Sequence, residues 1–272
     1  MADALPTWEV HAIRLGTVER AGGSNFLSGH GAGMMRLDFV MWLLQGPHGA
    51  VVVDTGFSAE AGLSRDREAS RAPGEAVRQL GLDPHDVGAV VLTHAHYDHA
   101  GNIDDFPRAR VVIQARELEY VTGARMRHPS LNHFFDVDDV VGLVRAVHRG
   151  NVDVVEGRHD LFPGVELHLL GGHTPGLQVV RVHTRRGWIV LASDALHYYA
   201  NFHRRDPFPA VVDLPQMLDG YDTLRGMVDS DQHLVPGHDP EVFVRFPGAG
   251  LPEGVVALHQ EPLRMDSSTG RK

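Results

Sequence analysis

Short apolar runs closed by glycine, proline or aspartate recur along most of the sequence and predict β-strands. The predicted strands cover residues 8–15, 36–44, 50–54, 89–92, 110–114, 165–170, 177–183, 188–192 and 232–235. The intervening patterns favour helices over residues 73–80, 115–121 and 214–228. Residues 21–35 are rich in glycine without a clear period and predict a long loop, and residues 123–160 predict an irregular or helical insertion.

The order of these elements predicts an α/β fold. Strands and a helix alternate up to about residue 160, and the same pattern then starts again. This arrangement favours two β-sheets packed together with helices outside. We expect one domain over residues 1–248, followed by a C-terminal extension over residues 249–272 that is partly disordered, chiefly over residues 266–272.

Composition excludes several kinds of partner and site. The formal net charge of −10 gives no electrostatic support for binding nucleic acid. There is no cysteine, so neither a disulfide nor a thiolate metal ligand can form. The first residues lack the pattern of a secretory signal, and no apolar stretch approaches the ~20 residues of a membrane span. We therefore expect no membrane partner, and the composition is compatible with a cytoplasmic location.

Three histidines and one aspartate lie within six residues, in the run HAHYDH over residues 94–99. The run directly follows the apolar segment 89–92, yet histidine and aspartate are poor strand formers and packing explains them badly. Neutral imidazole and carboxylate together favour zinc or a similar first-row metal. The run has enough ligands for two ions, so it predicts a dinuclear metal site at the end of a strand.

Three later residues can complete such a site, because each also follows a predicted strand. His173 lies in the turn GGHTPG over residues 171–176, Asp194 follows the strand 188–192, and His238 follows the strand 232–235. Side chains at the ends of different strands can converge at one edge of a sheet. For Asp194 and His238, the alternative is an ordinary turn residue that binds no metal.

Five motifs in order resemble the metallo-β-lactamase superfamily, and the resemblance covers about residues 8–247. The motifs are VDTG at residues 53–56, the run 94–102, GHTPG at residues 172–176, Asp194, and GHD at residues 237–239. The resemblance implies a hydrolase domain with a four-layer αβ/βα sandwich, in which the site lies at one edge of the two sheets.

The resemblance also implies a complete set of metal ligands. One ion would take His94, His96 and His173, the other would take Asp98, His99 and His238, and Asp194 would bridge them together with a hydroxide. Two zinc ions are the implied cofactors, with manganese, cobalt or iron as alternatives. Such a pair lowers the pKa of the shared water, and Asp98 would orient the hydroxide and carry its proton to the leaving group.

Within the superfamily, the chain resembles the N-acyl homoserine lactonases. This rests on Gln114 with ELEY at residues 117–120, on NF at 201–202 and PFP at 207–209, and on FP at 246–247. It implies opening of the lactone ring of N-acyl homoserine lactones, which is quorum quenching, with a small-molecule lactone as partner and a homodimer left open. The alternatives are a lactonase or esterase for a different small ring or ester, and a non-catalytic metal-binding module.

One position departs from that branch. The family has a tyrosine three residues after the bridging aspartate, where its phenol contacts the lactone, whereas this chain has His197 followed by Tyr198. Either His197 donates a hydrogen bond to the substrate carbonyl, or Tyr198 takes that place through a small loop shift. The candidate catalytic residues are therefore Asp98, His197 and Tyr198. Apolar residues of the first long loop, Phe26, Leu27, Met34 and Met35, either line an acyl-chain pocket or pack against the domain or a second copy.

Overall fold

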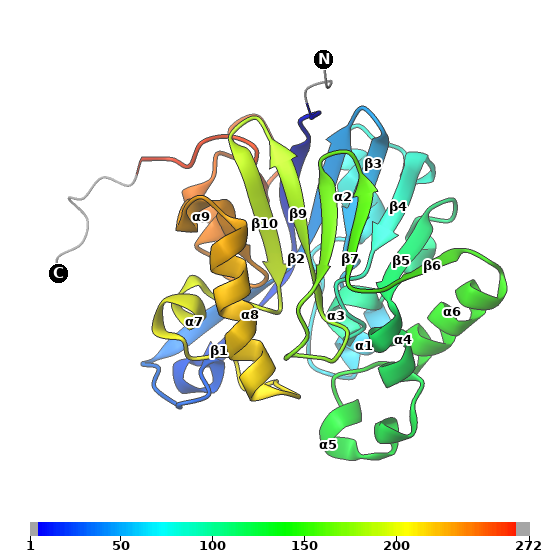
Figure 1. Ribbon diagram of the computed structural model, residues 1–272, viewed down its shortest axis with the longest axis vertical. Coiled ribbons are helices and arrows are strands. Elements are labelled where there is room, and N and C mark those ends of the chain that lie inside the picture. The colour runs from blue at the N-terminus through cyan, green and yellow to red at the C-terminus, as the bar shows by residue number, and fades with distance from the viewer. Residues whose placement is uncertain (1–4, 265–272) are drawn as a thin grey trace.

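The computed structural model describes residues 5–264 and shows two β-sheets packed face to face, with helices outside them (Figure 1). One sheet has seven strands in the order β12-β1-β2-β3-β4-β5-β6, and the other has five in the order β11-β10-β9-β8-β7. The strands are β1 (Glu9–Ala21), β2 (Met34–Gly46), β3 (Gly49–Val53), β4 (Val87–Val91), β5 (Arg110–Gln114), β6 (Val152–Val155), β7 (Arg158–Phe162), β8 (Val165–Leu169), β9 (Gln178–Thr184), β10 (Gly187–Ser193), β11 (Leu234–Pro236) and β12 (Val255–Ala257). The predicted two-sheet sandwich is confirmed.

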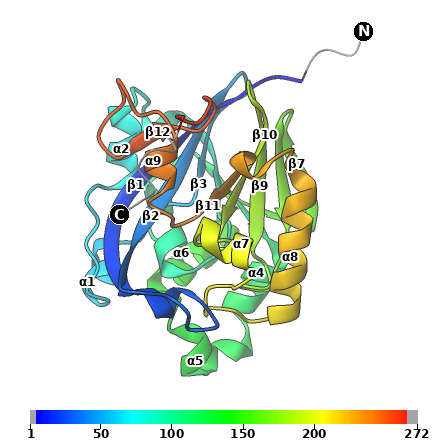
Figure 2. The same ribbon diagram turned by 90° about the vertical axis from the view of Figure 1, so that its left-hand side faces the viewer.

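Helices complete the outer layers of the sandwich. They are α1 (Ala59–Leu63), α2 (Pro73–Gln79), α3 (Tyr97–Ala100), α4 (Ala115–Val121), α5 (Pro129–Asn132), α6 (Val137–His148), α7 (Tyr199–Arg204), α8 (Leu214–Met227) and α9 (Val242–Arg245). Side chains from α2 and α6 join the apolar cluster on the outer face of the seven-stranded sheet. Those from α7 and α8 join the cluster on the outer face of the five-stranded sheet, and α8 lies along that face in Figure 2. A third cluster fills the space between the sheets.

Strand direction brings the ends of several strands to one edge of the sandwich. In the larger sheet, β3, β4, β5 and β6 run parallel. In the smaller sheet, β10 and β11 are parallel, and β8 points the same way as β10 because both are antiparallel to β9. The loops after β3, β4, β8, β10 and β11 can therefore contribute side chains to a common site.

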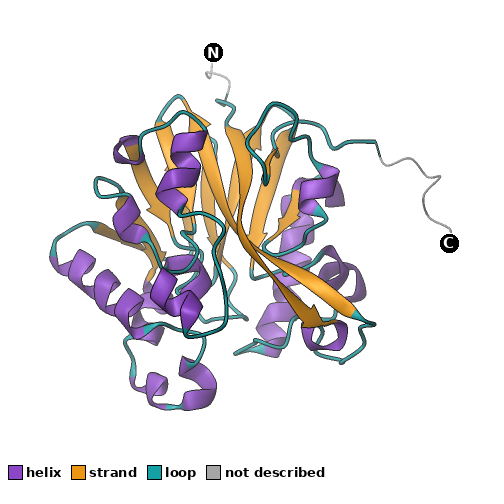
Figure 3. Cartoon of the chain, turned by 180° about the vertical axis from the view of Figure 1, so that it is seen from behind, coloured by secondary structure: helices purple, strands orange, loops and turns teal. Residues whose placement is uncertain are grey.

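The first two strands are longer than predicted and form a hairpin that extends beyond the rest of its sheet (Figure 3). Their pairing continues from Glu9 opposite Gln45 to Ala21 opposite Met34. The predicted loop over residues 21–35 is accordingly shorter, with the 3-10 turn Gly22–Asn25 followed by irregular chain. The prediction ended these strands too early, because polar residues interrupt the apolar runs. In the structure, the backbone pairing between β1 and β2 continues past those residues.

Three further strands were not predicted. β6 and the start of β7 lie inside the 123–160 segment, whose helical part ends with α6, and β12 lies beyond Gly248. All three are short and stand at sheet edges, so none carries a readable alternation. Val255 pairs opposite Ile13 and is buried, so the sandwich continues past the boundary that we drew at residue 248.

Two other expectations concern the ends of the chain and membranes. The disordered tail expected over residues 266–272 lies outside the described residues. Among the helices of residues 5–264, none combines the length and the apolar character needed to cross a membrane.

Candidate metal centre

Histidine and aspartate side chains meet at the edge where the strand ends converge. They come from the loops after β4, β8, β10 and β11 and from the short helix α3. The seven residues are His94, His96, Asp98, His99, His173, Asp194 and His238. All except the partly exposed Asp98 are buried. They form two groups, and within each group the potential ligand atoms lie within 4.8 Å of one another. The structure thus brings together every residue that the sequence nominated as a metal ligand.

Asp194 stands between two groups of donors and turns one carboxylate oxygen toward each. Its Oδ2 lies 3.2 Å from Nε2 of His173 and 3.8 Å from Nε2 of His94. Nδ1 of His96 lies 3.0 Å from the same Nε2 of His173 and closes the first group. The three imidazoles of the first group therefore lie on the Oδ2 side of Asp194.

The second group surrounds the other oxygen of Asp194. Oδ1 lies 2.9 Å from Nε2 of His238 and 3.2 Å from Nε2 of His99. The Asp98 carboxylate completes this group, with its oxygens 3.9 Å from Nε2 of His99 and 4.0 Å from Nε2 of His238. A carboxylate placed between two such groups is suited to bridging two cations.

The hydrogen-bonding state of these atoms tests whether metal ions fit. Nε2 of His94, His99 and His238 and Oδ1 of Asp194 are buried and have no hydrogen-bond partner among the described residues. Leaving such atoms unsatisfied costs about 1–3 kcal/mol each, whereas coordination to a cation would satisfy all of them. The donors are imidazoles and carboxylates without thiolate, which suits zinc and also manganese, cobalt or iron. The clusters fit a dinuclear metal centre.

Hydrogen bonds on the far side of three imidazole rings turn Nε2 into the centre. Nδ1 of His173 lies 2.6 Å from the Ala210 carbonyl oxygen, and Nδ1 of His238 lies 2.8 Å from the Asp38 carbonyl oxygen. A carbonyl only accepts, so Nδ1 carries the proton and Nε2 keeps its lone pair. Such partners fix ring orientation and tautomer in metal sites.

Asp54 provides the corresponding contact for His99 and ties several strand ends together. Its Oδ2 lies 2.8 Å from Nδ1 of His99, and its two oxygens accept hydrogen bonds from the Thr93 amide and hydroxyl, each at 2.8 Å. The Ser193 hydroxyl also donates to Oδ2 at 3.3 Å. Asp54 and Ser193 both have a left-handed backbone, with φ of 60° and 45°, a conformation that costs energy for residues other than glycine and clusters at functional sites.

The buried carboxylate of Glu117 connects two of the ligand loops. It accepts hydrogen bonds from the Ala95 amide at 2.9 Å and from the Gly176 amide at 3.1 Å. Burial raises the pKa of Glu117, although these hydrogen bonds oppose the shift. A Cβ at Gly176 would lie only 2.2 Å from the Glu117 nitrogen, so glycine is required where the loop meets α4. The sequence pointed to residue 117 only through its resemblance and gave no indication of this contact.

Burial also keeps His94 and His96 of the first group neutral. Desolvation lowers the pKa of His94 and His96 well below the usual histidine value, and the neighbouring histidines add to this effect. Metal ions bind the neutral form, so no proton has to be displaced from these rings near neutral pH.

The structure places His197, rather than Tyr198, beside the donor groups. Nε2 of His197 lies 2.9 Å from Oδ2 of Asp194, and neither ring nitrogen has a hydrogen-bond partner among the residues that the structure describes. The ring stacks on Phe208 with centroids 3.8 Å apart. Burial lowers the pKa of His197 to about 3, despite the opposing effect of Asp194. The Tyr198 hydroxyl points elsewhere and donates to the Arg36 carbonyl oxygen at 3.2 Å.

A small cavity of about 60 Å³ opens onto the donor groups. Its walls include His96, Asp98, His173, Asp194, His197 and His238 together with Val18, Arg20, Leu37, Phe39, Arg67, Tyr97, Phe134, Phe208 and Ala210. The loop residues proposed for an acyl chain are absent from this set: Phe26 is buried, whereas Leu27 and Met34 are exposed. The sequence did not single out Arg20 or Arg67, because neither lies in a motif and the folded chain alone brings them together.

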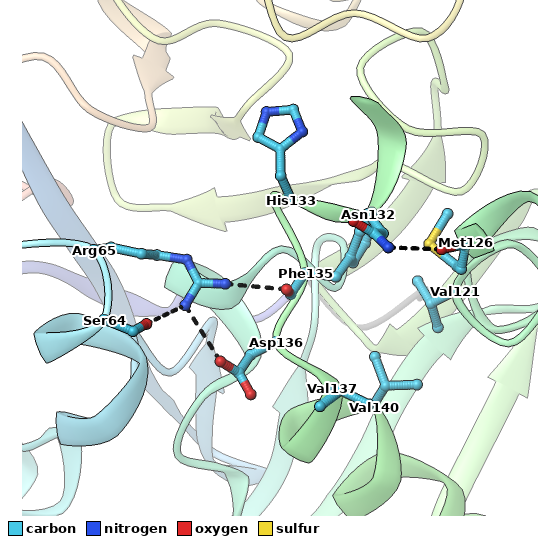
Figure 4. A pocket seen from close by; sticks show the side chains of 10 residues that line it. All are labelled: Ser64, Arg65, Val121, Met126, Asn132, His133, Phe135, Asp136, Val137 and Val140. Atoms are coloured by element: carbon cyan, nitrogen blue, oxygen red, sulfur yellow. Dashed lines mark hydrogen bonds and ion pairs between the residues drawn. The ribbon is translucent and has the colours of Figure 1, made fainter. Parts of the chain in front are cut away.

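A larger recess of about 590 Å³ lies beyond Phe135, whose ring packs 4.6 Å from that of His96. Figure 4 shows Arg65 at its edge, where the guanidinium donates to the Phe135 carbonyl oxygen at 3.1 Å and contacts Asp136 at 3.3 Å. The other wall is formed by α6 and the end of α4. This recess contains no potential metal ligand of the two groups and is separated from them by Phe135.

Comparisons with known proteins agree with this geometry. A curated N-acyl homoserine lactonase from Bacillus cereus is 27% identical over 224 residues, which is 76% of this chain and 84% of the relative. An N-acyl homoserine lactonase, AiiB, from Agrobacterium fabrum is 36% identical over 138 residues, 47% of each chain. The crystal structure of a Bacillus thuringiensis AiiA variant with N-decanoyl-L-homoserine at its active site superposes with a TM-score of 0.75, covering 89% of this chain and 96% of that one at 22% identity.

The family itself follows from the match to a sequence model of the whole domain. That model describes the metallo-β-lactamase superfamily and matches residues 40–243, a range that contains all seven clustered donors and most strands of both sheets. The chain, a metal-dependent hydrolase by its fold and its donor set, belongs to the metallo-β-lactamase superfamily.

Proposed function

We propose that this protein hydrolyses the ester bond of a lactone ring, with N-acyl homoserine lactones as the first substrates to test. The observation that carries the proposal is Asp194, which presents one oxygen to each of two donor groups beside a cavity. The relatives named N-acyl homoserine lactonases support the choice of a lactone. A ring-opening activity on these signals would make the protein a quorum-quenching enzyme.

The ligand assignment follows the two groups. His94, His96 and His173 would hold one ion, Asp98, His99 and His238 the other, and Asp194 both. We propose zinc as the metal, because each ion would have four imidazole or carboxylate ligands, the number typical of zinc sites. When bound, such a pair supplies a nucleophilic water of lowered pKa and polarises the ester carbonyl.

Asp98 is the proposed proton carrier. Its carboxylate oxygens lie 3.9 Å from Nε2 of His99 and 4.0 Å from Nε2 of His238. Asp98 lines the cavity and is the one residue of the seven donors that is partly exposed. From there it can orient the attacking water, accept its proton and deliver that proton to the ring oxygen as the alcohol leaves.

His197 is the proposed contact to the substrate carbonyl. Its neutral ring carries one N–H, lies in the cavity wall and is held in place by the stack on Phe208. A buried N–H aimed at the oxygen where negative charge develops stabilises the transition state. We set Tyr198 aside as the substrate contact, because its hydroxyl is engaged with Arg36.

An acyl chain would have apolar walls to follow from the metal centre. A second cavity of about 200 Å³ borders both His96 and His173 and includes Leu131, Phe134 and Val211 among its lining residues. Apolar walls next to a polar reaction centre are typical of sites for amphipathic ligands. This supports an acyl homoserine lactone over an unsubstituted ring.

A pH-indicator screen of lactones that differ in ring size and acyl chain, with and without a chelator, tests the proposal. We expect turnover of at least one acyl homoserine lactone and loss of that turnover on chelation. Hydrolysis that survives the chelator would refute the two-metal chemistry. Hydrolysis of open-chain esters alone would replace the lactonase with an esterase, and two bound metals without any turnover would favour a metal-binding module.

A further inference from the structure

Two arginines face the metal cavity from segments outside the ligand motifs. Arg20 belongs to the extended part of β1, and Arg67 follows α1 in the loop that leads to α2. Both side chains are partly buried, and both line the cavity that also contains Asp98 and Asp194. Neither residue is needed to hold the ligand loops, whose contacts run through Asp54 and Glu117.

These two arginines differ from their neighbours in having no carboxylate partner. Arg36 pairs with Asp38 at 2.8 Å, and Arg65 pairs with Asp136 at 3.3 Å. Among the described residues, no carboxylate oxygen lies within 4.0 Å of a guanidinium nitrogen of Arg20 or Arg67. A partly buried guanidinium without a counter-ion is costly, so an anion from outside the chain would be favoured there.

The local electrostatics strengthen this need for an anion. Burial lowers the pKa of Arg20, and the nearby positive charge of Arg67 acts in the same direction. Asp98, the acidic residue that acts on Arg20, would be a metal ligand in the proposed centre, so its charge would be shared with a metal ion. Two arginines beside a site for two dications would leave an excess of positive charge.

Packing fixes the direction of the Arg20 side chain. Its guanidinium carbon lies 4.8 Å from the centre of the Phe208 ring, and Phe208 stacks in turn on His197. A guanidinium that rests on an aromatic face keeps its N–H groups free for a ligand in the plane. Phe208 therefore connects Arg20 to His197, the residue that we assign to the substrate carbonyl.

We propose that Arg20 and Arg67 form an oxyanion subsite, which selects lactones that carry a carboxylate or a phosphate over their neutral counterparts. This rests on the proposed lactone hydrolysis. It moves the preferred substrate from the neutral N-acyl homoserine lactones to lactones that carry a negative charge. The planar guanidinium fork matches both oxyanions through paired hydrogen bonds, and a charge-assisted hydrogen bond contributes about 1.5–3 kcal/mol. The preference should therefore be about 10-fold or more in kcat/KM.

Two matched pairs of lactones test the subsite and tell the two oxyanions apart. One pair is a γ-butyrolactone bearing a ring carboxylate and its methyl ester, and the other bears a phosphorylated or a free hydroxymethyl group. The readout is the ratio of kcat/KM within each pair, so a general loss of activity cancels. We expect the zinc-loaded wild type to prefer at least one anionic member, and the R20Q/R67Q double variant to lose that preference.

Arg71→Gln provides the matched control. Arg71 lies four positions after Arg67, but its guanidinium donates to Gln79 at 3.0 Å and to the Glu253 carbonyl oxygen, away from the metal cavity. The R71Q variant should keep the wild-type ratio. The inference is overturned if the wild type shows no preference for either anionic member, or if the preference survives in R20Q/R67Q.

A binding measurement separates failure of this subsite from failure of the lactonase proposal. Cyclopentanone carboxylate and its methyl ester contain no ring ester bond, so calorimetric titration of the zinc-loaded protein with each reports recognition without turnover. If no lactone is hydrolysed, tighter binding of the carboxylate in the wild type and loss of that difference in R20Q/R67Q still support the subsite. Equal binding of both compounds, or a difference that persists in the double variant, refutes it.

Discussion

Oδ2 of Asp54 lies 2.8 Å from Nδ1 of His99, and the same carboxylate accepts hydrogen bonds from Thr93 and Ser193. One side chain at the end of β3 thereby orients a donor after β4 and connects it to the end of β10. The contact explains why Asp54 tolerates a left-handed backbone with φ of 60°. Three separate strand ends are set relative to one another by a residue that touches none of the proposed metal positions directly.

Asp54→Asn should weaken metal binding at the His99 group by about 10–100-fold, because an amide orients and polarises the ring less well than a carboxylate. Titration of the metal-free protein with zinc, against a competing chelator, measures the change. Asp83→Asn is the control, since Asp83 is exposed, accepts from the His85 amide and belongs to neither donor group. Equal zinc affinities for the wild type and Asp54→Asn would show that the Asp54–His99 contact does not tune the centre.

His197→Phe should lower kcat/KM on the best lactone by about 10-fold or more, because the substitution keeps the stack on Phe208 but removes the N–H donor. Steady-state kinetics with the zinc-loaded variant measures the loss. Full wild-type kcat/KM in His197→Phe would show that the ring does not contact the substrate carbonyl.

Tyr198→Phe separates structure from catalysis at the neighbouring position. The Tyr198 hydroxyl donates to the Arg36 carbonyl oxygen, so its removal should cost about 1 kcal/mol of unfolding free energy and leave the kcat/KM close to that of the wild type. Urea unfolding and kinetics on the same preparation report both quantities. A large drop in kcat/KM with unchanged stability would instead restore Tyr198 as the substrate contact.

Removing the metals should destabilise the fold as well as abolish activity. The buried donors after four strand ends would lose their common partner, and a ligand present at about 1,000 times its Kd contributes about 4 kcal/mol. For a chain of this size the melting temperature should fall by roughly 10 °C. Calorimetry before and after chelation, followed by addition of zinc, checks this. A melting temperature that does not change on chelation would mean that the donors are satisfied without metal.

Asp139 should make the protein less stable as pH rises. Burial and the nearby Asp136 raise the pKa of Asp139 to about 7, while an unfolded chain has the ordinary aspartate value. The folded state therefore holds a proton that the unfolded state has lost between about pH 4 and pH 7, so the unfolding free energy falls across this window and levels off above it.

Asp139→Asn should remove this dependence and stabilise the protein at pH 8 by about 1 kcal/mol, a value discounted for the partial exposure of the carboxylate. Urea midpoints measured from pH 5 to pH 8 give the slope. The control is Asp138→Asn, because that neighbour on α6 is exposed. A slope in Asp139→Asn equal to that of the wild type would contradict the assignment.

Local pattern and motif determined much of this protein from the sequence alone. The nine apolar runs anticipated most of the strands, because a buried strand needs a short run of apolar or β-branched residues whatever its neighbours are. The run at residues 94–99 predicted a metal site, because its potential ligands are close together in the sequence. His173, Asp194 and His238 were found because each follows a strand, which is also a local property.

Tertiary structure decided what depends on contacts between distant segments. It extended β1 through its ladder with β2, added β12 to the sheet edge, and turned one oxygen of Asp194 to each donor group. It also placed His197 in the cavity wall and brought Arg20 and Arg67 to the same cavity. No local sequence pattern predicts these contacts, because the residues involved are brought together only by the packing of the two sheets. That packing depends on the whole chain.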